Sequence, residues 1–270
     1  MRKCYIPNIE LIVTNRCNLN CACCLRGQKN ESCITDQVIE ATFDQIAGIG
    51  VLNIAGGEPT LVLDRVEKVI FYIIKQQIPV EVFTVTINGT VYSVEFLRLL
   101  DEISCYIGDS GKHTLFAISI DKYHKDEIKR IGMLDEWKEN LKRYSESKYF
   151  YGFRDIEQKL FREGNATGLD QKLTVPLRPM KTVMTYIKNG KLDIENGLCH
   201  IAPFIAINPN GIVTECNASI EHQETIYNYG NVLTESIEDI YIRNGAPILK
   251  PKQFEREASK ILRKYLTYNK

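Results

Sequence analysis

The first two-thirds of the chain alternate short β-rich runs with amphipathic stretches whose apolar residues recur at helical spacing. The β-rich runs predict strands over residues 8–14, 51–55, 80–86 and 113–121. The amphipathic stretches predict helices over residues 35–50, 63–77, 94–103 and 135–147. Thr35 is a candidate N-cap of the first helix, with Gly48 and Gly50 at its exit. Strands that alternate with helices of this length indicate βαβ units and a parallel sheet.

The pattern is less regular beyond about residue 150. Two β-rich runs within residues 204–216 flank Asn208-Pro209-Asn210-Gly211, which predicts a hairpin. Helices are predicted over residues 234–244 and 254–266. We therefore expect two parts: a main α/β domain over residues 1–185 and a C-terminal subdomain over residues 186–270.

Composition and charge exclude several classes of protein. The 270 residues are 44% hydrophobic and 25% charged, which is ordinary for a globular chain and excludes a disordered one. The 34 basic residues balance 34 acidic ones, so no excess of cations is available for nucleic acid or anionic lipid. The N-terminus lacks the apolar core of a signal peptide, and no apolar run is long enough to span a membrane. We expect a cytoplasmic protein without nucleic-acid or membrane partners.

Cysteine is the residue type that points to chemistry. Four of the nine cysteines fall within residues 17–24. An odd count, a tight cluster and no secretion signal favour metal binding or catalysis over a disulfide framework.

The spacing Cys17-x3-Cys21-x2-Cys24 offers three thiolates from one short loop directly after a predicted strand. Structural zinc usually takes four protein ligands, so a zinc site here would need a fourth ligand from outside this loop. Three thiolates on a four-iron cluster leave one iron without a protein ligand. An open iron of this kind is what reductive cleavage of S-adenosylmethionine requires.

The stretch TNRCNLNCACC, joined to GGEP at residues 56–59, resembles the radical SAM superfamily. The resemblance implies a partial parallel (β/α) barrel and a [4Fe–4S] cluster on Cys17, Cys21 and Cys24. It further implies an enzyme of the oxidoreductase or isomerase type that cleaves S-adenosylmethionine reductively to a 5′-deoxyadenosyl radical. That radical would abstract a hydrogen atom from a substrate carbon. An external reductant such as flavodoxin or ferredoxin would supply the electron.

Contacts to S-adenosylmethionine are also implied by the resemblance. Residues 164–166 resemble a later ribose or adenine segment of the family, and Tyr123 and His124 are either substrate contacts or the start of a helix. The residues implied to bind the cofactor are Gly56, Gly57, Glu58, Pro59, Asn88, Ser119 and Asp121.

One position departs from the family pattern. The residue before the third cluster ligand is often aromatic in the family, and here it is Cys23. The triad is therefore either Cys17, Cys21 and Cys24 or Cys17, Cys21 and Cys23. We adopt the first, because it keeps the family spacing, and expect Cys23 to pack as a small apolar side chain.

Cys199, Gly211 and Cys216 resemble the opening of the SPASM and twitch subdomains, which hold auxiliary iron–sulfur clusters. No cysteine follows Cys216, so we expect a truncated, twitch-like cap of a hairpin and a helix. Three interpretations of the pair remain. The cysteines are buried structural residues, or Cys216 donates a hydrogen atom to a substrate radical, or the pair holds a residual auxiliary cluster or metal site, with His200 or His222 as a further ligand.

Substrate class is the least determined property. Many peptide-modifying relatives carry an N-terminal recognition domain, and Cys17 lies too near the start for one. This favours epimerisation or dehydrogenation of a small polar molecule such as a sugar, an aminocyclitol or a nucleotide. A maturase or epimerase of a ribosomal peptide is the main alternative. A glycyl-radical-enzyme activase and a zinc-stabilised binding protein are the others.

Overall fold

The computed structural model describes residues 4–108, 111–155, 159–177, 181–188, 191–192, 199–203, 205–215, 218–244 and 248–249. Five parallel strands form its centre and pair in chain order. They are β1 (Cys4–Thr14), β2 (Ile46–Gly56), β3 (Val80–Ile87), β4 (Thr114–Ser119) and β5 (Phe150–Arg154). The connecting helices are α1 (Asp36–Phe43), α2 (Leu63–Lys75), α3 (Val94–Ile107), α4 (Lys122–Arg130) and α5 (Leu134–Ser145). The predicted α/β fold, a partial parallel barrel, is confirmed.

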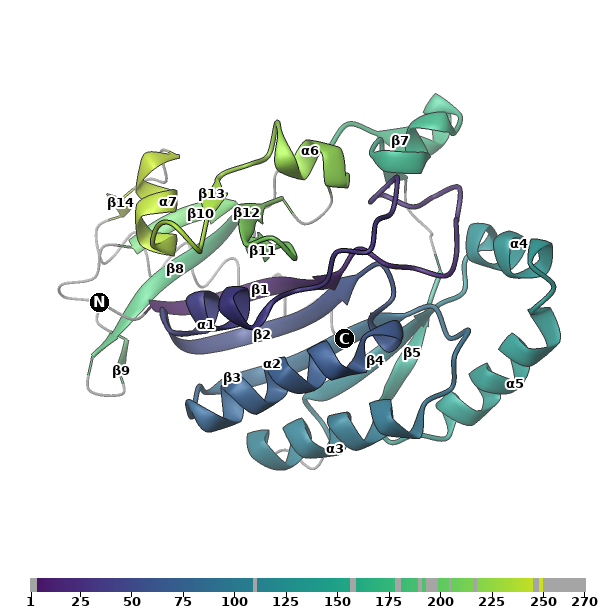
Figure 1. Cartoon of the computed structure of the whole chain (residues 1–270), viewed down its shortest axis with the longest axis horizontal. Helices are drawn as coiled ribbons and strands as arrows, with labels where there is room; N and C mark the ends of the chain where they lie inside the picture. Colours follow the sequence, from purple (N-terminus) through teal and green to yellow (C-terminus); the bar gives the residue numbers. More distant parts are fainter. Residues whose placement is uncertain are drawn as a thin grey trace.

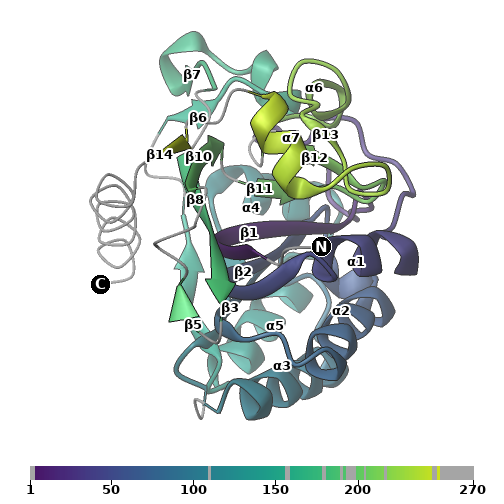
Figure 2. The ribbon, with the colours of Figure 1, turned by 90° about the vertical axis from the view of Figure 1, so that its left-hand side faces the viewer.

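The helices α1, α2 and α3 lie side by side along one face of the sheet (Figures 1 and 2). Helix α2 shows how the sequence places them there, since Val66, Val69, Ile70 and Ile73 recur at helical spacing and are all buried. A stripe of this width is what an amphipathic helix presents to a core. Each fully buried side chain of this size contributes about 1.5–3 kcal/mol.

The predicted helix over residues 35–50 is shorter in the structure. The N-cap is confirmed, because the Thr35 hydroxyl accepts a hydrogen bond of 3.3 Å from the Val38 amide. The helix nevertheless ends at Phe43, and strand β2 begins at Ile46.

Pairing with β1 explains where β2 begins, because Ile46 lies opposite Cys4, and β3 joins on the other side from Ile49. Gly48 and Gly50 lie inside the strand rather than at a helix exit. Leu52 stands between Ile9 of β1 and Phe83 of β3, and all three side chains are fully buried. Cross-strand packing of this kind outweighs local helix propensity.

Strand β1 is also the edge from which the later part of the chain extends. Strand β11 (Ile205–Ile207) pairs parallel with β1, and β12 (Ile212–Thr214) pairs antiparallel with β11, which confirms the predicted hairpin. The remaining strands are β6 (Leu160–Phe161), β7 (Thr174–Val175), β8 (Lys181–Lys188), β9 (Lys191–Leu192), β10 (Cys199–Pro203), β13 (Gly230–Asn231) and β14 (Ile248–Leu249). The remaining α-helices are α6 (Ile220–Glu224) and α7 (Ile237–Arg243).

The predicted division between residues 185 and 186 falls inside β8, which pairs with both β1 and β10. The division stays a prediction. Cys216 and the predicted helix over residues 254–266 lie outside the described residues. Among the helices that the structure describes, none has the length and apolar content needed to cross a bilayer.

Candidate cofactor site

A cavity of about 440 Å³ lies at the carboxyl ends of the parallel strands, which is where ligands bind in open α/β sheets. Its lining includes Cys17, Cys21 and Cys24, called the cluster cysteines below. It also includes the predicted cofactor residues Gly56, Gly57, Glu58, Asn88, Ser119 and Asp121. Pro59 lies beside this lining, at the start of the 3-10 helix η1 (Pro59–Leu61).

The cluster cysteines lie on residues 15–32, called the cluster loop below. Its two ends are tied together, because the Thr14 hydroxyl donates a hydrogen bond of 3.0 Å to the Ser32 carbonyl. Within the loop, the Cys24 amide donates to the Cys21 carbonyl at 3.1 Å. This turn brings two cluster cysteines to the same side of the loop.

The electrostatics of the cluster cysteines fit a cationic metal group. Burial raises the pKa of Cys17 to about 11. Burial also raises the pKa of Cys21 to about 12, and the neighbouring charges of Cys17 and Cys24 add to that shift. Three thiolates close together in a buried place repel one another unless a cation neutralises them.

The cluster cysteines, as described, are not gathered around a single-ion position. In the part of the chain that the structure describes, one trio of potential ligands lies within 4.8 Å of one another, and it is Cys23, Asp121 and His124. The cluster cysteines are therefore more widely spread. Sulfurs around a single tetrahedral zinc lie about 3.8 Å apart. The described arrangement is therefore not that of a closed single-zinc site.

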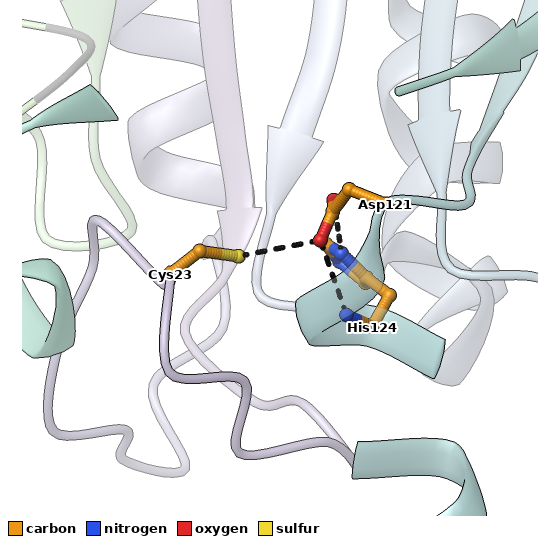
Figure 3. Close-up of side chains that lie close together, drawn as sticks. All are labelled: Cys23, Asp121 and His124. Carbon is orange, nitrogen blue, oxygen red and sulfur yellow. Dashed lines mark hydrogen bonds and ion pairs between the residues drawn. The ribbon is translucent and has the colours of Figure 1, made fainter. Parts of the chain in front are cut away.

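Cys23 points away from the loop toward the start of α4, where its Sγ lies 3.8 Å from Oδ1 of Asp121 (Figure 3). Burial and the Asp121 charge raise the pKa of Cys23. Asp121 caps α4 by accepting from the amides of Tyr123 at 2.9 Å and His124 at 3.1 Å. Cys23 is thus a thiol engaged with a helix cap, which favours Cys24 as the third cluster ligand.

Asp121 is held as a carboxylate. Burial alone would raise its pKa, but the His124 ring outweighs that effect through a hydrogen bond of 2.6 Å and its charge. The two backbone donors at the helix start act in the same direction. The pKa of Asp121 therefore lies below its ordinary value, and a negative charge faces the cavity.

The GGEP segment lies directly on the cluster loop. The Gly57 amide donates to the Thr14 carbonyl and the Glu58 amide to the Arg16 carbonyl, both at 2.7 Å. A Cβ on Gly57 would lie 1.9 Å from the Arg16 oxygen, and one on Gly56 would lie 2.4 Å from the Thr14 oxygen. The chain's own backbone therefore requires glycine at both positions.

Glu58 is buried with 1% exposure and joins the ends of two strands. It accepts from the Thr60 amide and hydroxyl, at 3.1 and 2.5 Å, and from the Asn88 amide at 2.7 Å. Burial raises the pKa of Glu58, and these hydrogen bonds partly offset that effect. Asn88 continues the network to Asn18 on the cluster loop at 2.9 Å and accepts from the Trp137 indole at 2.8 Å.

A polar ladder beside the cavity was not predicted from the sequence. Glu10 on β1 accepts from Asn53 on β2 at 2.9 Å, and Asn53 accepts from Thr84 on β3 at 2.9 Å. Arg26 donates to Glu10 at 2.7 Å, and these two side chains are 12% and 13% exposed. The signal in the sequence was weak, because Asn53 is the one polar side chain of β2, whereas β1 also holds Asn8 and β3 also holds Glu81 and Thr86.

Comparison with known sequences establishes the family. The sequence model described as the Radical SAM superfamily matches residues 11–153, which is more than half of the chain. The protein belongs to the radical SAM superfamily. It is therefore an enzyme by family, and its cofactors are a [4Fe–4S] cluster and S-adenosylmethionine.

Individual relatives are distant. An uncharacterized protein of Methanocaldococcus jannaschii, MJ0907, is 26% identical over 109 residues, and the match covers 39% of this chain and 38% of that protein. Native anSMEcpe with bound AdoMet and Cp18Cys peptide is 13% identical, with 92% of this chain and 82% of that chain covered and a TM-score of 0.48. Streptococcus suis SuiB bound to its precursor peptide SuiA is 13% identical, with 87% and 64% covered and a TM-score of 0.41.

Proposed function

We propose that this enzyme binds its [4Fe–4S] cluster through Cys17, Cys21 and Cys24 and abstracts a hydrogen atom from a carbon of a small polar substrate. When bound, the cluster and S-adenosylmethionine supply a one-electron cleavage of the sulfonium that leads to this abstraction. The single observation that carries the proposal is the cavity that gathers the cluster cysteines and the GGEP segment at one end of the sheet.

The chain's own residues have distinct tasks in this proposal. The cluster cysteines would hold the cluster and would leave one of its irons without a protein ligand, available to the cofactor. Glu58 fixes Asn88 relative to the cluster loop and thereby shapes the cavity wall. Asp121, kept charged by His124, offers a carboxylate to hydroxyl or ammonium donors of the cofactor. Gly56, Gly57 and Ser119 line the cavity beside these groups.

The polar ladder supports a polar substrate. Arg26 lines the cavity and forms an ion pair with Glu10. Glu10 in turn accepts a hydrogen bond from Asn53, which accepts one from Thr84. A substrate rich in hydroxyl or amino groups would exchange hydrogen bonds with Arg26, the ladder residue that lines the cavity, whereas an apolar substrate would leave them unmade.

The outcome of the reaction depends on how the substrate radical is quenched. Epimerisation needs a hydrogen donor, for which Cys216 stays the predicted candidate, whereas dehydrogenation needs an electron acceptor. A low-potential partner such as flavodoxin or ferredoxin would supply the electron for each cleavage.

The test is anaerobic reconstitution followed by addition of a reductant and S-adenosylmethionine. We expect about four irons per chain and release of 5′-deoxyadenosine. Cys17→Ala should abolish the release, and Cys105→Ala, at an exposed position on α3, should leave it intact. Iron-loaded protein that cleaves no S-adenosylmethionine would contradict the proposal. Cleavage that is stimulated by peptides and not by sugars or nucleotides would retain the chemistry and reject the substrate class.

A further inference from the structure

Asn165 contacts the cluster loop through both its backbone and its side chain. Its amide donates to the Cys24 carbonyl at 2.9 Å. Its side-chain nitrogen donates to the Cys21 carbonyl at 3.0 Å and to Oδ1 of Asn20 at 3.2 Å. Two cluster cysteines are therefore held from outside the loop by one half-buried residue.

The contact is close enough to require glycine on both sides. Gly164 has φ +51° and Gly27 has φ +74°. A Cβ on Gly164 would lie 2.4 Å from both the Gly27 nitrogen and the Leu25 oxygen. The segment that precedes Asn165 thus packs backbone against backbone on the cluster loop.

The same segment also contacts helix α6, through Glu163. Glu163 is 4% exposed and accepts from the Ser219 amide at 2.9 Å, with His222 Nδ1 also at 2.8 Å. Ser219 is the N-cap of α6. The Ile220 amide in addition donates to the Arg26 carbonyl of the cluster loop at 3.0 Å. The cluster loop, the segment and α6 also surround a second cavity of about 530 Å³.

We propose that residues 163–165 form a clamp that couples the cluster loop to helix α6, with Asn165 as a positioning residue for the cluster cysteines. Binding of the cluster fixes the Cys21 and Cys24 carbonyls, which are the acceptors of Asn165. The fixed segment in turn holds Glu163 and therefore the first turn of α6. Cluster binding thus orders a helix that carries no cluster ligand. The inference rests on the proposed cluster site.

Hydrogen exchange tests the coupling directly. Full-length protein is compared by mass spectrometry before and after anaerobic cluster reconstitution, with iron content measured on the same samples. We expect amides of residues 218–224 to exchange about tenfold more slowly once the cluster is bound. Unchanged exchange in fully iron-loaded wild type would overturn the coupling and leave the proposed function standing. Wild type that takes up no iron would overturn both.

Two variants separate the positioning role from general stability. Asn165→Ala should lose most of the cluster-dependent protection, release iron to a chelator roughly tenfold faster, and change the electron paramagnetic resonance spectrum of the reduced cluster. Thr234→Ala is the control, because it also removes one side-chain hydrogen bond to a backbone carbonyl, that of Asn231, outside the clamp. Wild-type spectra and iron release in Asn165→Ala would refute the positioning role.

Discussion

Two carboxylates near the cofactor cavity respond to their surroundings in opposite directions. Burial raises the pKa of Glu58, and its hydrogen bonds only partly offset that. Glu127 on α4 accepts from Arg130 and from the Asn20 amide of the cluster loop, at 2.7 and 2.8 Å. The Arg130 hydrogen bond is the main reason that the pKa of Glu127 falls to about 2. Burial thus dominates the pKa of Glu58, whereas an ion pair dominates that of Glu127.

Glu127 makes stability depend on pH in a predictable direction. A depressed pKa contributes stability above the ordinary value of 4.5, and that contribution is lost as the pH falls toward about 2. We expect Glu127→Gln to lower the unfolding free energy of the cluster-free protein by about 1 kcal/mol at pH 6, since Arg130 is largely exposed and screened. The difference from wild type should vanish near pH 2. Urea unfolding at both pH values measures it, and a difference that grows on acidification would contradict the assignment.

The two candidate triads make different predictions at single residues. Cys24→Ser should prevent binding of the cluster, whereas Cys23→Ser should retain about four irons per chain. The reason is that Cys23 points at Asp121, while Cys24 is bonded in the turn with Cys21. Iron and sulfide analysis after anaerobic reconstitution decides between them. Loss of iron in Cys23→Ser with retention in Cys24→Ser would reverse the ligand set.

At the scale of elements, two departures from the sequence-based prediction have physical causes. Strand β2 extends back to Ile46 because its first residues pair with β1, and no local pattern reports that pairing. For helix α4 the sequence indicated only a start at Tyr123 and His124, which the structure confirms, because the rest of the helix is largely polar, with Glu127 and Ile128 its buried positions. By contrast, α2 was predicted nearly to its ends, since its apolar stripe alone specifies a helix.

The contact between GGEP and the cluster loop can be tested with two glycines. Gly57→Ala should lower the unfolding free energy by more than about 3 kcal/mol and reduce iron binding, since its Cβ would overlap the Arg16 carbonyl. Gly168→Ala should change stability by less than about 0.5 kcal/mol, because no atom lies within 4 Å of the added carbon. Chemical unfolding and iron content measure both variants. Equal effects would show that the close approach is absent in solution.

At the scale of the whole molecule, residues far apart in sequence meet at one end of the sheet. The cluster motif and GGEP were recognisable from spacing, and the parallel order of the strands implies that their ends meet. The ladder of Glu10, Asn53 and Thr84 and the clamp at Asn165 were not recognisable in that way. The ladder depends on the register between neighbouring strands, and the clamp depends on a contact between segments more than 100 residues apart. The order of residues along one element encodes neither.

The Glu10–Arg26 pair joins β1 to the cluster loop and gives a whole-molecule prediction. Glu10→Ala should lower the unfolding free energy by about 3 kcal/mol, because it leaves a nearly buried guanidinium without its carboxylate. Arg98→Ala, which breaks exposed ion pairs with Glu67 on α2 and Glu102 on α3, should change the unfolding free energy far less, because solvent screens them. Urea unfolding of the cluster-free protein measures both, and similar losses would contradict the burial of the pair.

The open iron is the central claim, and electron–nuclear double resonance tests it most directly. The reduced, reconstituted protein is measured with S-adenosylmethionine that carries a nitrogen-15 label on its amino group. We predict a nitrogen coupling to the cluster that is present in wild type and absent in Cys17→Ala. Saturating cofactor without any nitrogen coupling, on protein that holds its cluster, would show that all irons are otherwise ligated and would contradict the account.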